Sequence, residues 1–487
     1  MRLTNAALML LITVSGAACS DSGAPTAESE PLLSAGSANA AGDVPTGRHI
    51  IQFTKEPASD FAQQVESLGG RVEWTGAGLA TVSGLDLAGR NRLSGRKDVR
   101  LILDDVAFAL DLPQGGQSEP ELAGSAPASP AQPNTSFFFP RQWHLRAVGA
   151  DQAWAAGYRG SPSVKVFVLD TGIDETHVDL AGLVDLSLSK DLLGTILVES
   201  GGVLVPFDEA ALVQQLFPGR PATSDLFYHG THVAATISSN ALAAAGMSSQ
   251  TKLVAVKVCA VLNICPFSSV LNGIIYAADN DADVVNLSLG GGFAKAGNGQ
   301  FLGFINQVFN YARSRGTTIV VAAGNDTTDL DHNRNTFATY CDAPGVICVS
   351  ATGPTNQAAT NGPWTQTDAP ATYTNFGRSV IAVAAPGGNL NAAPAPSTFV
   401  TAACSSTSLI IPACQAAKSF VVGSAGTSMA APHVAGAAAM LVPQLGRNPA
   451  GIHARLQKSA DDLGQSGTDP YYGKGRLNVA RAVGAIQ

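Results

Sequence analysis

Charged side chains are scarce in this sequence: Asp, Glu, Lys and Arg make up 14% of its 487 residues. The 29 Lys and Arg residues are outnumbered by 37 Asp and Glu residues, which gives a net charge of -8. A nucleic-acid-binding surface needs concentrated positive charge, so this balance argues against nucleic acid as a partner. The low charge and the 45% of hydrophobic residues exclude wholesale disorder and provide for a large buried core.

Long hydrophobic runs are missing from the body of the chain, which argues against a membrane-spanning helix there. The amino terminus differs, because a cationic start is followed by an apolar run over residues 6–14 and by small residues up to Cys19. This layout predicts a secretory signal over residues 1–19. It also resembles a bacterial lipoprotein signal, in which Cys19 becomes the lipidated first residue, whereas cleavage near Ala17 or Ala18 would leave Cys19 unmodified. We therefore expect a secreted or periplasmic protein that contacts a membrane only through a lipid on Cys19.

Cysteine is rare, with seven residues in the chain. Apart from Cys19, the cysteines form three close pairs along the sequence: Cys259 and Cys265, Cys341 and Cys348, and Cys404 and Cys414. In an exported protein, an even number of cysteines in neighbouring pairs predicts local disulfides, although other pairings remain open at this point. A zinc site is disfavoured because no pair has the two-residue spacing of a zinc knuckle.

The sequence divides into two blocks behind a loose start. Residues 20–47 are rich in Ser, Ala, Gly and Pro without periodicity, which predicts a flexible tether. The first block, residues 48–112, has the pattern strand, helix, strand, strand, helix, strand. Its predicted strands cover 49–53, 71–74, 79–83 and 99–103, and its predicted helices cover 61–68 and 85–93. This order is typical of a small α+β, ferredoxin-like domain.

A Pro-rich joint and a larger block follow. Prolines among Ser, Ala and Gly indicate that residues 113–140 form a linker without a packed core and with an accessible processing site. In residues 141–487, helical patterns alternate with apolar runs over 164–169, 253–258, 284–289, 319–323, 346–349 and 380–384. Strands that are apolar on both faces predict an α/β fold with a mostly parallel sheet and helices on both faces. Functional groups in such sheets lie at the carboxyl ends of the strands.

Two motifs at the start of this block carry groups suited to catalysis. Asp170 ends the first predicted strand and begins a D-T-G-I-D motif. Taken alone, it is explained as well by an aspartate that caps the following turn. His229 begins an H-G-T-H-V-A motif that leads into an apolar helix. A zinc pair of His229 and His232 is disfavoured, because helical zinc pairs usually have four-residue spacing with a Glu between them.

Two further motifs supply a hydroxyl and an amide. Ser428, in the motif G-T-S-M-A-A-P-H, lies near the amino end of a predicted buried helix. Free N–H groups and the helix field favour negative charge there, although a lone serine would be an N-cap. Asn325 follows a predicted strand in the motif A-A-G-N. Its amide would suit an oxyanion, and the alternative is an ordinary turn residue.

In the chain order Asp, His, Asn, Ser, the four motifs together resemble those of the subtilisin-like serine proteases. The resemblance covers residues 142–483 and includes the G-K-G-R-L-N segment that begins at Gly473. Its most specific motif is S-M-A-A-P-H. The resemblance implies a subtilisin-like α/β fold and a serine endopeptidase that works through an acyl-enzyme without a cofactor.

The resemblance also implies a role for each motif residue. Asp170 would orient His229 and stabilise its charged form, and His229 would be the general base and then the general acid. Ser428 would be the nucleophile, and its N–H together with the Asn325 amide would hold the oxyanion. The implied substrate-binding residues are an edge strand of Ser288, Leu289 and Gly290 and the wall of a roomy apolar primary pocket, Ala323 and Gly324.

Other parts of the chain gain a meaning from the same resemblance. Residues 48–112 resemble the inhibitory propeptide of this family, whose tail blocks the cleft until it is removed autocatalytically. His232 and His433 would be structural. We therefore expect a self-processing zymogen that is a monomer, whose polypeptide partners are its substrates and its own propeptide.

The sequence departs from the compact members of the family in two insertions and one loop. The insertions, residues 186–224 and 389–420, are expected to rim the cleft. Asp179 resembles one calcium ligand of the family, but the short, Ala-rich segment 239–247 offers it no evident partners, with Asn240 its only side-chain amide. We therefore assign no metal, and a structural calcium ion stays an open question.

Two other classes of function fit the sequence less well than a protease. A catalytically silent, protein-binding relative would not need all four motif residues. A lipase or esterase with the same chemistry would carry G-x-S-x-G in the order Ser, Asp, His, whereas the order here is Asp, His, Ser.

Overall fold

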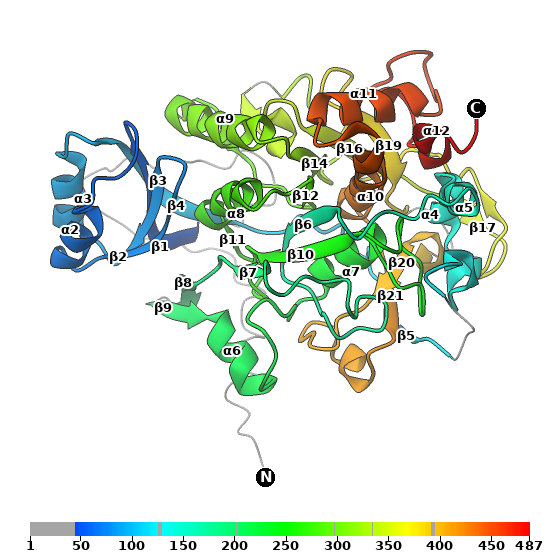
Figure 1. Ribbon diagram of the computed structural model, residues 1–487, viewed down its shortest axis with the longest axis horizontal. Helices are drawn as coiled ribbons and strands as arrows, with labels where there is room; N and C mark the ends of the chain where they lie inside the picture. Colours follow the sequence, from blue (N-terminus) through cyan, green and yellow to red (C-terminus); the bar gives the residue numbers. More distant parts are fainter. Residues whose placement is uncertain (1–43, 125–128, 201–202, 297, 334, 391–394) are drawn as a thin grey trace, which may run out of the picture.

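A computed structural model describes residues 44–124, 129–200, 203–296, 298–333, 335–390 and 395–487. The predicted signal with Cys19 and most of the predicted tether lie outside the described residues. Figure 1 shows the first block, in blue, beside the larger second block.

The larger block is built on one seven-stranded sheet with the order β19-β16-β14-β12-β6-β10-β7. All its neighbouring strands pair in parallel. The strands are β6 (Lys165–Asp170), β7 (Lys190–Asp191), β10 (Lys252–Lys257), β12 (Val284–Leu287), β14 (Thr318–Ala322), β16 (Ile347–Thr352) and β19 (Val383–Pro386). The predicted parallel α/β sheet is confirmed.

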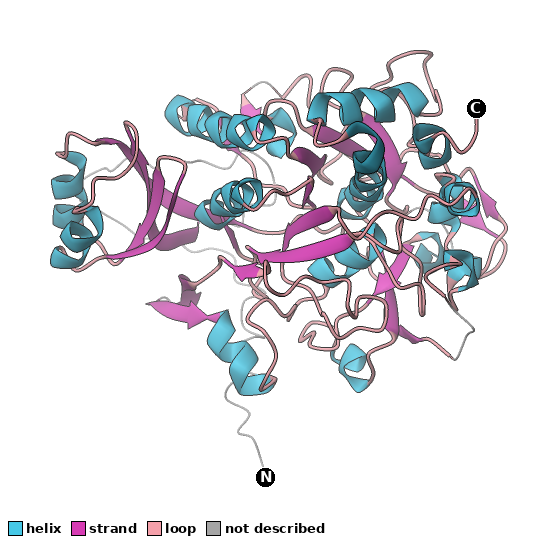
Figure 2. Cartoon of the chain, in the orientation of Figure 1, coloured by secondary structure: helices cyan, strands magenta, loops and turns pink. Residues whose placement is uncertain are grey.

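Both faces of this sheet are apolar because helices cover both (Figure 2). Val166 and Val168 of β6 pack in a core with α7 (His229–Ile237) and α10 (Thr427–Leu445). Phe167 and Leu169, which point the other way, pack with helices α8 (Phe267–Asp279) and α9 (Gly299–Ser314). Further helices of this block are α4 (Trp143–Ala147), α5 (Ala150–Ala155), α11 (Pro449–Ser459) and α12 (Val479–Val483).

The first block is the predicted ferredoxin-like α+β domain. Its elements are β1 (Val44–Phe53), α2 (Phe61–Ser67), β2 (Arg71–Gly76), β3 (Leu79–Ser83), α3 (Leu87–Ser94) and β4 (Val99–Phe108). The strands are antiparallel in the order β4-β1-β3-β2. Strand β4 runs past its predicted end at residue 103, because its last residues pair with β11 (Cys265–Pro266) of the larger block.

The sheet of the first block lies between its own helices and the larger block (Figure 1). Ile51 and Ile102 pack with α2 and α3, in a core that belongs to this domain alone. Their neighbours Ile50 and Leu103 point to the opposite face and pack with α8. The domain thus has its own core and a second apolar face that the larger block covers.

The joint between the blocks is more ordered than the sequence predicted. In its described residues, 113–124 and 129–140, strand β5 (Glu121–Leu122) pairs with β21 (Phe420–Ser424), and β21 pairs with β20 (Val400–Ala403). Short helices η1 (Pro133–Thr135) and η2 (Phe139–Arg141) follow, and Phe138 is buried against Ala243 and Ala244. The prediction of a segment without packing was wrong here, because extended backbone can pair with a strand edge whatever its side chains.

The first insertion forms β7, the hairpin β8 (Thr195–Ser200) and β9 (Val203–Asp208), and α6 (Glu209–Leu216). The start of α6 is anchored by a buried ion pair, with 2.6 Å between Nζ of Lys257 and Oε1 of Glu209. Strand β8 lies against β1 of the first block. This insertion therefore contacts the amino-terminal domain.

The three predicted disulfides, Cys259–Cys265, Cys341–Cys348 and Cys404–Cys414, are present. The first shapes the loop that ends in β11, and the third lies in the second insertion. The other short elements are β13 (Phe293–Ala294), β15 (Thr336–Phe337), β17 (Asn356–Gln357), β18 (Trp364–Thr365), η3 (Tyr340–Asp342), η4 (Ala395–Thr398) and η5 (Pro412–Ala416). Among the described residues, no helix has both the length and the apolar character that crossing a membrane requires.

Candidate active site

The carboxylate at the end of β6 and the imidazole at the start of α7 are in contact. Oδ1 of Asp170 lies 2.8 Å from Nδ1 of His229, and it accepts a hydrogen bond from the N–H of Thr171 at 2.8 Å. Burial alone would lower the pKa of His229, but the charge of Asp170 and its hydrogen bond outweigh burial and raise that pKa. Nε2 of His229 is buried and has no partner among the described residues, so it is free to accept a proton.

Asp225 also supports this histidine, and the sequence analysis missed it. Its Oδ1 accepts the N–H of Tyr228 at 3.0 Å, and its Oδ2 accepts the N–H and the hydroxyl of Thr231 at 2.8 and 2.6 Å. The carboxylate thereby caps the first turn of α7. It fixes the start of this helix and so the position of His229, the first residue of α7. An aspartate just before a predicted helix is a capping signal that could have revealed it.

Ser428 lies in the first turn of α10 and is 5% exposed. Its hydroxyl donates to the carbonyl oxygen of Ser288 at 3.1 Å, and the hydroxyl of Ser288 donates to the carbonyl of Ser428 at 2.7 Å. The predicted serine, histidine and aspartate thus lie on three adjoining elements, but the serine hydroxyl points to Ser288 in this state.

The side chain of Asn325 is fixed by the residue next to Ser428. Its Oδ1 accepts hydrogen bonds from the N–H and the hydroxyl of Thr427, at 2.8 and 3.0 Å. The side-chain nitrogen of Asn325, Nδ2, must therefore point away from Thr427. Gly324 has φ +94° and lies so close to Asn375 that a Cβ would come within 2.4 Å of the Asn375 amide nitrogen, so only glycine fits before Asn325.

The amide of Asn325 holds a carbonyl of the amino-terminal block. Its Nδ2 donates to the carbonyl oxygen of Asp111 at 2.6 Å, and its backbone N–H donates to Oδ2 of Asp111 at 2.6 Å. Burial raises the pKa of Asp111 to about 6, and the neighbouring charge of Asp326 adds to this shift. The backbone carbonyl of Asp111 is thus the acceptor of the hydrogen bond that Nδ2 of Asn325 donates.

The residues before Asp111 pack beside the predicted substrate-binding residues, because Leu110 belongs to the same buried cluster as Leu289 and Ala323. Leu110 is 4% exposed and its N–H donates to Oδ1 of Asn263 at 2.7 Å. The ring of Phe108 contacts that of Phe267, with 5.0 Å between centroids, and lies over Gly291. Among the described residues, the strand before Asp111 pairs with β11 and not with residues 288–290, the substrate-binding edge strand that the resemblance implies.

The other histidines of the motifs bind backbone carbonyls. Nε2 of His232 lies 3.0 Å from the carbonyl oxygen of Val400, and burial lowers the pKa of His232 to about 3. Nδ1 of His433 lies 2.8 Å from the carbonyl oxygen of Met429, and burial lowers the pKa of His433 to about 4. His144, which the sequence analysis did not single out, contacts Nε2 of His433 at 2.8 Å. These three buried imidazoles are neutral, and they pack between the helices and the strands that they contact.

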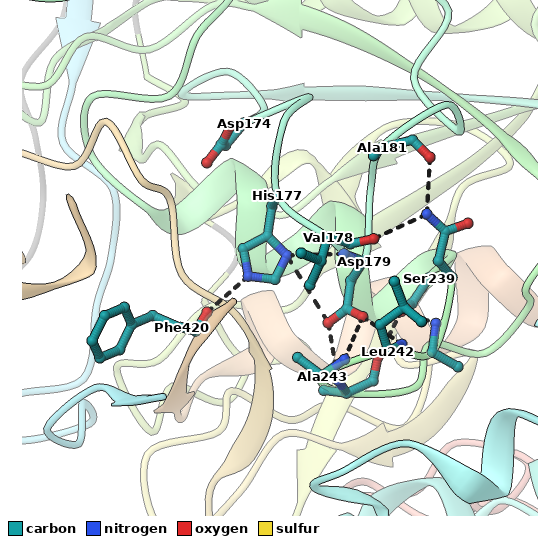
Figure 3. Close-up of polar contacts among 12 residues, drawn as sticks. Asp174, His177, Val178, Asp179, Ala181, Ser239, Leu242, Ala243 and Phe420 are labelled. Atoms are coloured by element: carbon teal, nitrogen blue, oxygen red, sulfur yellow. Dashed lines mark hydrogen bonds and ion pairs between the residues drawn. The ribbon is translucent and has the colours of Figure 1, made fainter. Parts of the chain in front are cut away.

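The loop after α7 closes over Asp179 without a metal ligand set (Figure 3). Oδ1 of Asp179 accepts the N–H groups of Leu242 and Ala243 at 2.8 Å each, and its Oδ2 accepts that of Ala244 at 2.9 Å. The amide of Asn240 donates to the nearby carbonyl oxygens of Val178 and Ala181, at 3.1 and 2.9 Å. In the described part of the chain, no three His, Cys, Asp or Glu side chains gather where they could hold a metal.

The geometry assembles the groups that acyl transfer requires. A carboxylate orients an imidazole whose other nitrogen is free, a hydroxyl lies at a helix amino end, and an amide donor meets a peptide carbonyl. Such an amide stabilises the negative charge that develops on a carbonyl oxygen under attack.

Comparison with known proteins agrees with this chemistry. The sequence matches the Subtilase family over residues 161–475. Thermitase of Thermoactinomyces vulgaris is 32% identical over 354 residues, which cover 72% of this chain and 99% of that protein. Subtilisin E of Bacillus subtilis (strain 168) is 31% identical over 344 residues, covering 69% of this chain and 70% of that protein.

Solved structures share the fold over most of the chain. The epidermin leader peptide processing serine protease of Staphylococcus aureus superposes with a TM-score of 0.65 at 18% identity and covers 90% of this chain and 98% of its own. Fervidolysin of Fervidobacterium pennivorans superposes with a TM-score of 0.64 at 21% identity and covers 91% of this chain and 62% of its own. At these identities the likeness is one of fold.

Proposed function

Since the chain belongs to the subtilase family of serine proteases, we propose that it is an endopeptidase made as a self-processing zymogen and inhibited by its own amino-terminal domain. The observation that carries this proposal is the carbonyl of Asp111, which accepts the amide of Asn325 at 2.6 Å. The domain thereby presents a peptide bond to the groups that would cleave one.

In the proposed reaction, the hydroxyl of Ser428 attacks the substrate carbonyl and passes its proton to Nε2 of His229. The hydroxyl first rotates from Ser288 toward His229, a change that substrate-free and inhibited sites commonly require. Asp170 stabilises the protonated ring, which then gives its proton to the leaving nitrogen. Asn325 donates to the oxyanion. The proposed substrate-binding surface comprises Ser288, Leu289, Gly290, Ala323 and Gly324.

Buried polar contacts hold the amino-terminal domain in place. Oδ1 of Asp105 accepts the N–H of Ser268 at 2.8 Å and so caps α8 of the other block. The guanidinium of Arg48 donates to the carbonyls of Leu193 and Thr195 in the first insertion, the latter at 2.7 Å. These contacts support an inhibitor that is held at several points besides the cleft.

Added as a separate polypeptide, residues 44–111 should inhibit casein hydrolysis by the mature enzyme. Leu110→Ala in this segment should weaken the inhibition about 10- to 100-fold, because a buried leucine contributes about 1.5–3 kcal/mol. The inhibition constant is measured by titration at fixed substrate concentration.

The matched control is Leu87→Ala. Leu87 is 69% exposed on α3, away from the cleft, and its loss should leave the inhibition constant unchanged. Full activity of the mature enzyme in micromolar excess of the unaltered segment would refute the zymogen proposal.

Inhibition by the same segment should weaken as the pH rises. A carboxyl whose pKa is higher when bound takes up a proton on binding, so the full affinity holds below the ordinary value of 3.8 and is lost as the pH rises through about 6. Between pH 4.5 and 7.5 we expect the inhibition constant to rise by about 30-fold. Asp111→Asn should flatten this dependence, and an unchanged slope in that variant would contradict the assignment to Asp111.

Removal of calcium should leave the stability almost unchanged. The oxygens of Asp179 already accept three N–H groups, and Asn240 binds the neighbouring carbonyls, so this loop does not fit a metal. An ion that does not bind the native state adds no stability, so Tm in EDTA and in millimolar calcium should agree within about 2 °C. A large loss of Tm in EDTA would show a calcium site elsewhere in the chain.

We also propose that the enzyme is exported from the cytoplasm. The predicted signal over residues 1–19 and the three disulfides support a secreted or periplasmic enzyme, with lipidation of Cys19 as the proposed anchor. We further propose that it acts as a monomer and that both insertions narrow the cleft. Intact mass of the purified protein would show the lipid directly.

A further inference from the structure

The chain is fixed just before Asp111. Strand β4 ends by pairing Phe108 with Cys265 of β11. Leu110 then donates its N–H to Asn263 at 2.7 Å and buries its side chain. These contacts leave the backbone little freedom where it enters the site.

The chain is fixed again shortly after Leu112. The carbonyl of Gly116 accepts the N–H of Ala425 at 2.7 Å, and the N–H of Ser118 donates to the carbonyl of Gly423 at 2.9 Å. Strand β5 continues this pairing along β21, the strand that leads directly to the helix of Ser428. The segment between the two anchors therefore crosses the active site.

Only one carbonyl in this segment is bound by the candidate oxyanion donor among the described residues. That carbonyl belongs to Asp111, and the donor is the Nδ2 of Asn325, whose Oδ1 is held by Thr427 directly before Ser428. Resting on the function proposed above, we infer that the bond between Asp111 and Leu112 is the self-processing site. The predicted processing site within residues 113–140 would then lie downstream of the true one.

The step forms and breaks bonds in balance. The oxygen of Ser428 bonds to the carbonyl carbon of Asp111 while its proton moves to Nε2 of His229. The bond from that carbon to the nitrogen of Leu112 breaks, and the proton on His229 goes to this nitrogen. Water then adds its hydroxyl to the Asp111 carbonyl carbon while its remaining proton moves to His229. The bond from that carbon to the Ser428 oxygen breaks, and the proton on His229 goes to this oxygen.

The same contacts define the class of substrate. An aromatic ring fits at the position of Phe108, against Phe267 and Tyr340, and a leucine fits at that of Leu110. The side chain of Asp111 accepts the N–H of Asn325 at 2.6 Å, so this position takes a carboxyl or a carboxamide. A carboxamide suits it better at neutral pH, because the charge of Asp326 acts on this position. A large apolar residue, which the roomy apolar pocket implied by the resemblance would favour, lacks this acceptor.

The bond is tested by sequencing the amino terminus of the purified full-length protein after self-processing. We expect Leu112 as the new terminus and Asp111 as the last residue of the released fragment. Leu112→Pro should abolish this terminus, because the proline ring crowds the scissile nitrogen and restricts the backbone of Asp111 before it. Gln114→Pro is the control: Gln114 precedes Gly115, which has φ +74°, in a turn closed by a 2.9 Å hydrogen bond from Gly116 to Pro113, and proline suits that position.

A terminus within residues 113–140 in the wild-type protein, with normal processing of Leu112→Pro, would overturn the inference and leave the zymogen proposal intact. Processing of a Ser428→Ala chain in a protease-free preparation would instead overturn the zymogen proposal. The substrate class is tested with two peptides of sequence 107–114, one carrying Asn and one carrying Leu at position 111. Faster hydrolysis of the Asn peptide at pH 7 supports the assigned class, and faster hydrolysis of the Leu peptide contradicts it.

Discussion

Replacing Ser428 with alanine should abolish hydrolysis of casein and leave the chain uncut. The hydroxyl is the atom that would form the acyl-enzyme, so no other group takes its place. The expected loss of turnover is on the order of 10⁶-fold, the size that removal of the nucleophile from a subtilisin produces. Casein hydrolysis and the intact mass of the purified variant measure both effects.

The control is Ser314→Ala, which removes an exposed hydroxyl near the end of α9 and should change neither activity nor processing. Self-processing by Ser428→Ala at the normal rate, in a preparation free of other proteases, would contradict the assignment of the nucleophile.

Replacing Asn325 with alanine should lower kcat by about 10²- to 10³-fold with little change in KM, the size that loss of one oxyanion donor produces in a subtilisin. The amide acts mainly on charge that develops in the transition state, so the ground-state complex is affected less. Steady-state kinetics on a peptide substrate separates the two constants.

Asn325→Asp is the informative companion, because it keeps the shape of the side chain but offers an acceptor where a donor is needed. It should lose at least as much activity as the alanine variant, with Tm within a few degrees of the wild type. A change confined to KM in both variants would mean that Asn325 is only a turn residue.

The parallel sheet and the motif residues could be predicted because each depends on local sequence. The apolar run that became β6 places Asp170 at a strand end, and strand ends in parallel sheets converge on one edge. The contact between Asp170 and His229, 59 residues apart, follows from that convergence together with the resemblance of the motifs.

The contacts that occupy the site could not be predicted, because they depend on where distant segments meet. No local pattern around Asp111 predicts that its carbonyl accepts a hydrogen bond from Asn325, 214 residues later in the chain. Strand β5 has only two residues and owes its form to the edge of β21. Asp225 carried a local capping signal, but its value lies in supporting His229, which the tertiary structure reveals.

The central claim is that Ser428 is an activated nucleophile to which the amino-terminal domain closes access. Its most direct test is mass spectrometry of the mature enzyme after treatment with a phosphonylating serine reagent, with and without added residues 44–111. The account predicts one adduct per chain, on the peptide that contains Ser428, and strong slowing of its formation by the added segment. No adduct at Ser428, or labelling of Ser428 at the same rate with and without the segment, would contradict it.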